Sequence, residues 1–280
     1  MSKSTVLLEH SILHTLTYFE LFRYPPTFKE LVTYSSIGCS DSEVQACVKN
    51  LVSRKRVIVQ GERVAMKAQT HSVFDRNSQI SSSRIREFEA LSPWFTWIPM
   101  VSYVGISGSL SMHDADFEAD IDIFLITAPN AVWITRSILL TITRTASLFG
   151  NNTARMLCWN IMIEESDLSL PPQKRNEYTA HEILQLHTVF QRHHMYSRLL
   201  HANSWITQIF PNVQVNYTNN HDSYRLLKQP KIICWLDNLL RFFQRLWLIK
   251  KGYLIHEHGR QVWFIQDDYE KKIPLKLKKV

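Results

Sequence analysis

Residues 101–127 read VSYVGISGSLSMHDADFEADIDIFLIT, and the two apolar runs in this stretch predict two strands separated by a turn and an acidic loop. Gly105 and Gly108 lie at the end of the first run, and glycine lets a backbone turn tightly and approach a ligand closely. Ser109 follows at the expected start of a helical turn, where unpaired backbone amides favour an anion. We therefore expect a phosphate group beside Gly108 and Ser109, with Ser107 as a phosphate-side or turn residue.

Two aspartates, Asp120 and Asp122, lie at the start of the second apolar run. Because successive side chains of a strand point to opposite faces, these two carboxylates are expected on the same face. Adjacent carboxylates repel each other and are costly to bury unless a cation lies between them. Their hard oxygen ligands suit Mg²⁺ rather than zinc, and two such ions would steady both oxygens of a phosphoryl displacement. The alternative interpretation is an acidic, solvated loop that runs into a strand.

The Gly108-Ser109 pair, a short spacer and the Asp-Ile-Asp-Ile of residues 120–123 resemble the signature of the DNA polymerase beta-like nucleotidyltransferase superfamily. The resemblance covers roughly residues 100–165. It implies that Asp120 and Asp122 bind catalytic Mg²⁺, with Mn²⁺ as an alternative, and that the turn holds a nucleoside triphosphate. It further implies transfer of a nucleoside monophosphate to a hydroxyl acceptor, which the resemblance does not identify.

The superfamily usually adds a third carboxylate on a later strand, and here the sequence departs from the pattern. Residues 156–163, MLCWNIMI, are the expected strand, and Asn160 falls near the position of that aspartate. Asparagine keeps an oxygen but lacks the charge, so Asn160 would support nucleotide and metal binding only. Glu164 shares the parity of Asn160 and is the expected general base, whereas Glu165 faces the other way. The missing acid favours the alternative of an inactive, nucleotide-binding regulatory protein.

The N-terminal part predicts three helices followed by a hairpin. Helical periodicity covers residues 9–23, the capping-box sequence Thr27–Glu30 starts a second helix, a third begins near Ser40, and residues 57–66 predict two strands. This order resembles a winged helix-turn-helix domain. As a DNA-binding element its third helix would present Gln45, Lys49 and Asn50, with Arg54, Lys55, Arg56 and Arg63 near phosphates. The alternative is that the module packs on the central domain or mediates pairing.

Helices are also expected over residues 82–91, 130–149, 176–192 and on to 210, with Arg136 and Arg144 of the second of these as surface charges. Residues 231–250 predict an amphipathic helix with its apolar side chains, Trp235, Leu239, Phe242, Phe243 and Leu246, facing the core and with Arg241 and Arg245 outward. An apolar acceptor or a membrane surface is the alternative partner for that stripe. QVWFIQ predicts a further strand before a basic tail. His181, Glu182 and His187 lack the spacing of a zinc-protease motif.

The expected fold is therefore α+β: a winged helix over residues 1–70, a nucleotidyltransferase mixed sheet with flanking helices over 71–170, and a helical C-terminal region over 171–280. The segments YFELFRYPPTFKEL, GS with DID, and TAHEILQL make this layout similar to prokaryotic nucleotidyltransferase-domain proteins with an N-terminal winged helix. The net charge of +7 fits an anionic partner such as a nucleotide, and nucleic acid through the winged helix is a further candidate. With no long apolar run and four dispersed cysteines, a cytoplasmic protein without a transmembrane segment is expected.

Overall fold

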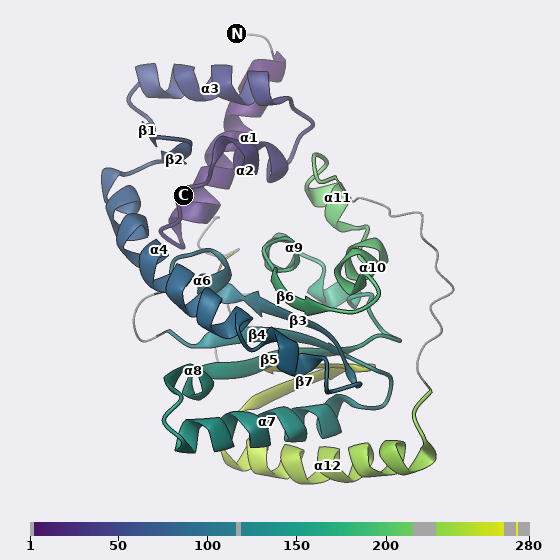
Figure 1. Ribbon diagram of the computed structural model, residues 1–280. Helices are drawn as coiled ribbons and strands as arrows, with labels where there is room; N and C mark the ends of the chain where they lie inside the picture. Colours follow the sequence, from purple (N-terminus) through teal and green to yellow (C-terminus); the bar gives the residue numbers. More distant parts are fainter. Residues whose placement is uncertain (1–2, 116–118, 215–227, 266–272, 274–280) are drawn as a thin grey trace.

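The structure is a computed structural model that describes residues 3–115, 119–214, 228–265 and 273. It is a mixed α+β protein in which helices cover both faces of a six-stranded sheet. Figure 1 shows the N-terminal helices at one end of the molecule and the helices α7 and α12 at the opposite end, beyond the sheet. The acidic residues Asp116 and Glu118 and the basic C-terminal tail lie outside the described residues.

Three helices and a hairpin form the N-terminal unit, as predicted. They are α1 (Lys3–Glu20), α2 (Phe28–Thr33), α3 (Asp41–Ser53), β1 (Ile58–Gln60) and β2 (Arg63–Ala65). Capping boxes start α2 and α3, because Thr27 and Ser40 each accept a hydrogen bond from the backbone of a glutamate three residues later, whose carboxylate reaches back. The apolar faces meet in one core that includes Ile12, Leu31 and Leu51.

The central sheet has the strand order β6-β3-β4-β5-β8-β7. Its strands are β3 (Val101–Ser107), β4 (Ile121–Thr127), β5 (Leu157–Glu164), β6 (His187–Gln191), β7 (Leu254–His258) and β8 (Gln261–Ile265). Only the pair β4 and β5 is parallel among these described neighbours. The strands predicted from VSYVGIS, DIDIFLIT, MLCWNIMI and QVWFIQ are confirmed as β3, β4, β5 and β8. Strands β6 and β7 were not predicted, and both lie in the C-terminal region 171–280 that was expected to be helical.

Helices connect and cover these strands. They are α4 (Ala68–Glu89), α5 (Ser92–Phe95), α6 (Gly108–Ser111), α7 (Val132–Leu148), α8 (Asn152–Arg155), α9 (Glu177–Leu184), α10 (Met195–Ala202), α11 (Ile206–Ile209) and α12 (Lys231–Lys250), with a 3-10 turn at Pro172–Lys174. The prediction of one helix over 176–192 was wrong, since β6 follows α9 and pairs with β3. Helix α4 begins well before residue 82, where only a linker was expected.

The alternation of side chains along β4 separates two cores. Ile121, Ile123 and Leu125 pack on the side of α4, α7 and α12, whereas Phe124 and Ile126 pack on the side of α1, α9 and α10. Asp122 shares the parity of Phe124 and Ile126, so it faces the second side.

An aromatic cluster joins the N-terminal unit to α9. The ring of His181 lies between Tyr18 and Tyr34, with ring centroids 3.8 Å and 4.3 Å away, and Phe19 and Phe210 meet its edge. Burial lowers the pKa of His181 well below its usual value, so the ring is neutral and acts as an aromatic packing element. The cluster holds α1 against the second face of the sheet.

Helix α12 has the opposite orientation to the one predicted. Trp235, Phe242 and Phe243 are exposed, and Asp237 and Leu248 are the buried residues of the helix. Arg136 of α7, predicted as a surface charge, is buried as well and donates to Gln244 of α12. No helix among the described residues combines the length and the apolar character that crossing a membrane requires.

Candidate functional site

A cavity of about 610 Å³ lies on the second face of the sheet, between helices α1 and α9. This volume falls within the range of small-molecule sites. Its polar lining comes from several elements and comprises Ser107, Gly108, Ser109, Asp120, Asp122, Cys158, Asn160, Lys174, Tyr178, Thr179, Glu182 and Gln185. Its apolar lining includes Leu21 and Phe22 of the turn after α1, Phe124 and Ile161 of the sheet, and Trp263 of β8. A ligand with one charged and one apolar part would match both linings.

The structure brings Asp120 and Asp122 together in this cavity. Asp120 is exposed just before β4 begins, and Asp122 is half-buried within the strand. Burial, together with the charge of Asp120, raises the pKa of Asp122 to about 6, against a hydrogen bond from Asn160 that lowers it. The ionised form of Asp122 is therefore disfavoured, first by burial and then by repulsion from Asp120.

Gly108 brings the backbone directly against Asp122. Its φ of +66° belongs to the left-handed region, and a Cβ at this position would lie 2.5 Å from Asp122 Oδ2. Ser107, which is buried, donates from its hydroxyl to the backbone carbonyl of Asp122 at 3.4 Å. Ser109 is exposed in the short helix α6. The turn therefore places the Gly108 backbone and the exposed Ser109 side chain beside the carboxylate pair.

Asn160 also lies in the cavity, and it forms a bulge in β5. Ile123 of β4 pairs with Trp159, and the next residue, Phe124, pairs with Ile161, so that Asn160 is the additional residue. Its side-chain amide donates to Asp122 Oδ1. Asn160 therefore donates a hydrogen bond to Asp122, whereas a carboxylate at this position would repel it.

The bulge also explains why Glu164 does not join these residues. Beyond Asn160 the alternation is reversed, so that Ile161 lines the cavity and Met162 packs in the opposite core. Glu164 shares the parity of Met162 and lies in a separate, small cavity of about 30 Å³. The prediction that Glu164 lies beside Asp122 was wrong, because it required regular alternation along β5 and the bulge at Asn160 interrupts that alternation.

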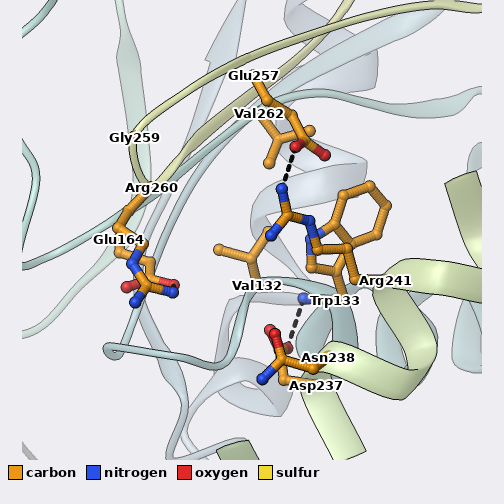
Figure 2. Close-up of a pocket in the computed structure, with 10 residues that line it drawn as sticks. All are labelled: Val132, Trp133, Glu164, Asp237, Asn238, Arg241, Glu257, Gly259, Arg260 and Val262. Atoms are coloured by element: carbon orange, nitrogen blue, oxygen red, sulfur yellow. Dashed lines mark hydrogen bonds and ion pairs between the residues drawn. The ribbon is translucent and has the colours of Figure 1, made fainter.

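Figure 2 shows this small cavity, where Glu164 faces Arg260 and α12 meets the β7–β8 hairpin. Arg260 Nη1 lies 3.9 Å from Glu164 Oε1, and Arg241 pairs with Glu257. Asp237 Oδ1 accepts hydrogen bonds from the backbone N–H groups of Trp133 and Ile134, at 2.7 Å and 2.8 Å. The cavity has room for little more than a water molecule, and its charged groups fasten α12 to its neighbours.

Glu182 of α9 is the acidic residue that sequence reasoning missed as a site residue. It lines the large cavity, and burial and then the charge of Asp122 raise its pKa to about 7, while a hydrogen bond from Tyr178 lowers it. Tyr178 and Glu182 are four residues apart, so helical spacing placed them on one face, but only the tertiary structure brings that face to Asp122.

Lys174 and Cys158 complete the titratable lining and were not predicted either. Lys174 is buried, with its ammonium group 4.9 Å from the centre of the Trp263 ring. Burial and the charge of Asp122 raise the pKa of Cys158 to about 12, so it is a neutral thiol, and it donates to Asn160 Oδ1 at 2.8 Å. The lining contains three carboxyl groups, those of Asp120, Asp122 and Glu182, and one lysine, so acidic groups outnumber basic ones in this cavity.

The donor set fits a hard divalent cation with few protein ligands. In the part of the chain that the structure describes, no group of three or more His, Cys, Asp or Glu side chains could hold a metal. Asp120 and Asp122 supply two carboxylates, which is the number that Mg²⁺ commonly takes from a protein when phosphates and water complete its octahedron. The excess negative charge of the lining and the raised pKa of Asp122 agree with such an ion.

Searches with this chain find no matching protein-family model, no matching curated protein and no matching solved structure.

Proposed function

We propose that the protein is a Mg²⁺-dependent nucleotidyltransferase that transfers a nucleoside monophosphate from a nucleoside triphosphate to a hydroxyl acceptor. The observation that carries the proposal is the pair Asp120 and Asp122, which lies beside the Gly108 turn in a cavity of about 610 Å³. The motif of residues 108–123 resembles the DNA polymerase beta-like superfamily, and the position of its Gly-Ser pair and its two aspartates around one cavity supports that relation.

Each part of the lining has a role in this proposal. Gly108 and Ser109 cradle the phosphates, because both line the cavity beside Asp122 and the glycine lets the backbone approach closely. Asp120 and Asp122 hold Mg²⁺, which neutralises the phosphate charge when it is bound. Lys174 adds positive charge to the same lining, and the aromatic side chains of the apolar lining contact the nucleobase or the acceptor.

Glu182 is the general base of the proposed reaction. The acceptor hydroxyl transfers its proton to the Glu182 carboxylate while its oxygen forms a bond to the α-phosphorus. The bond between the α-phosphorus and the oxygen that bridges it to the β-phosphorus breaks, and pyrophosphate leaves with that oxygen. A carboxylate with a pKa of about 7 is half-ionised near neutrality and is a stronger base than an ordinary glutamate. Positioning and charge neutralisation supply the rest of the acceleration.

Two isosteric variants test the assignment. Incubation with labelled triphosphates, Mg²⁺ and candidate hydroxyl acceptors should release pyrophosphate, and Glu182→Gln should slow the release by about 100-fold or more while nucleotide binding persists. Glu164→Gln makes the same substitution at a glutamate of the separate cavity and should leave the rate within about twofold. A rate lost in Glu164→Gln and kept in Glu182→Gln would reject Glu182 as the base.

An inactive, nucleotide-binding regulator is the second candidate. Asn160 in place of an acid favours it, as do the exposed residues Gln45, Lys49 and Asn50 on α3, which a winged helix would present to DNA. In that case nucleotide and Mg²⁺ would stabilise the fold without release of pyrophosphate. DNA binding with a steep salt dependence that persists in the double variant Asp120→Asn, Asp122→Asn would identify the regulator.

A further inference from the structure

Helix α12 exposes an apolar face to solvent. The residues of this outer face are 38–60% exposed and comprise Ile232, Trp235, Leu239, Phe242, Phe243, Leu246, Trp247 and Ile249. The neighbouring helix α7 extends it, since Ile142, Leu148 and Phe149 are exposed as well. Figure 1 shows the two helices side by side at the end of the molecule away from the N-terminal unit. Exposed apolar surface on this scale marks an interaction site.

Polar contacts on the inner side fix this orientation. Asp237 caps the start of α7, and Gln244 donates to the Trp133 carbonyl and the Ser137 hydroxyl, both at 2.9 Å. Arg241 binds Glu257 of β7 (Figure 2). Arg245 pairs with the same carboxylate. Rotation of α12 to bury its aromatic residues would break all of these contacts, so the outer face stays outward.

The charges around the outer face match an anionic surface. Lys231 lies at one end of α12 and Lys250 and Lys251 lie at the other, all exposed. Arg144 of α7 and Lys251 both lie over the Trp247 ring, 5.6 Å and 6.0 Å from its centroid. Within α7 and α12, the sole acidic residue is Asp237, which is buried. A second copy of the same face would bring these cations together, which disfavours pairing.

We propose that the outer face of α12 docks on an anionic lipid bilayer, with the helix lying in the plane of the membrane surface. Tryptophan, phenylalanine and leucine on one side, with lysine and arginine at the borders, are typical of helices that bind at this interface. The five charged residues of α12 keep it from spanning. The candidate cavity lies on the opposite face of the sheet, so docking leaves it accessible to soluble nucleotides.

Flotation of the full chain with vesicles tests this proposal. The chain should float with vesicles of phosphatidylcholine that contain about one third phosphatidylglycerol, and less with phosphatidylcholine alone. The variant Trp235→Ser, Phe242→Ser, Phe243→Ser should bind at least about tenfold more weakly. The control Trp94→Ser, Trp97→Ser removes two exposed aromatic side chains outside α12 and should bind as the parent does. Melting followed by circular dichroism should be unchanged in both variants, because the substituted side chains are exposed.

Three results would overturn the proposal. The first is a parent chain that does not float with anionic vesicles, and the second is a triple variant that floats as the parent does. The third is a dimer in light scattering that the triple variant converts to a monomer without any change in flotation, since it assigns the face to a second copy. Lys250→Glu, Lys251→Glu tests the charge: it should weaken binding to anionic vesicles only, and equal binding of parent and variant would reject the anionic partner.

Discussion

Replacing Asp122 by asparagine removes a charge that the fold holds at a cost. Burial and the neighbouring charge of Asp120 raise the pKa of this carboxyl from 3.8 to about 6. One pKa unit corresponds to about 1.4 kcal/mol, so ionisation costs the folded state up to about 3 kcal/mol well above pH 6. Solvent in the cavity screens part of this, and we expect Asp122→Asn to raise the free energy of unfolding by roughly 1–3 kcal/mol near pH 8.

The sign of the pH dependence follows from the direction of the shift. Because the folded pKa is raised, the contribution of Asp122 to stability is full below its unfolded pKa of 3.8 and is lost as the pH rises through about 6. Asp122→Asn cannot ionise at this position, so it does not lose stability in this pH range. Its advantage over the parent should therefore be absent near pH 4 and should grow to its full value near pH 8.

Urea unfolding of both proteins, without divalent ions and then with Mg²⁺, measures the effect. Mg²⁺ should stabilise the parent and leave Asp122→Asn unchanged, because the variant cannot hold the ion. In the titration without divalent ions, Asp120→Asn serves as the comparison, since it relieves only the repulsion by Asp120 and leaves the burial of Asp122, so it should stabilise the chain less. With Mg²⁺ it should gain less stability than the parent, because it removes the other proposed ligand of the ion. If Asp122→Asn unfolds at a lower urea concentration than the parent near pH 8 without Mg²⁺, the carboxylate is stabilising and the argument for a cation fails.

Three further substitutions test other contacts. Gly108→Ala places a Cβ against Asp122 in a left-handed conformation and should lower the free energy of unfolding by about 2 kcal/mol or more, whereas Gly150→Ala has a positive φ but open space and should cost about 1 kcal/mol in the same urea titration. His181→Phe should flatten the stability profile below about pH 6.5, because the lowered pKa of His181 makes the parent lose stability as the pH falls below the unfolded pKa, and an unchanged thermal-melt profile would contradict this. Asp237→Ala removes the acceptor of two backbone N–H groups and should cost about 1–2 kcal/mol, while Asp237→Asn, which keeps an acceptor, should cost less in the same denaturation assay.

Features with local causes could be predicted from the sequence. The capping boxes at Thr27 and Ser40 need only residues within one helical turn, and both helices begin where expected. The alternation of residues 120–126 likewise put Asp120 and Asp122 on one face, and the structure brings both to one cavity. Such patterns depend on backbone periodicity, which the chain carries in its own order of residues.

Features that depend on distant partners could not be predicted. The predicted orientation of α12 was wrong, because periodicity shows that a helix has two faces but not which of them is buried. The contacts that decide this, made by Asp237, Gln244 and Arg241, form only after the chain has folded. The prediction that Glu164 lies beside Asp122 was wrong because a bulge at Asn160 reverses the alternation of side chains along β5.

The sequence by itself determined the mixed α+β composition, the starts of the helices and the carboxylate pair beside a glycine turn, because each depends on residues close together in the chain. Only the tertiary structure decided that Glu182 joins that pair, that Glu164 does not, and that α12 presents its aromatic side to the outside. The physical reason is that burial and charge pairing act between residues far apart in sequence, and their balance is set when whole faces pack against each other.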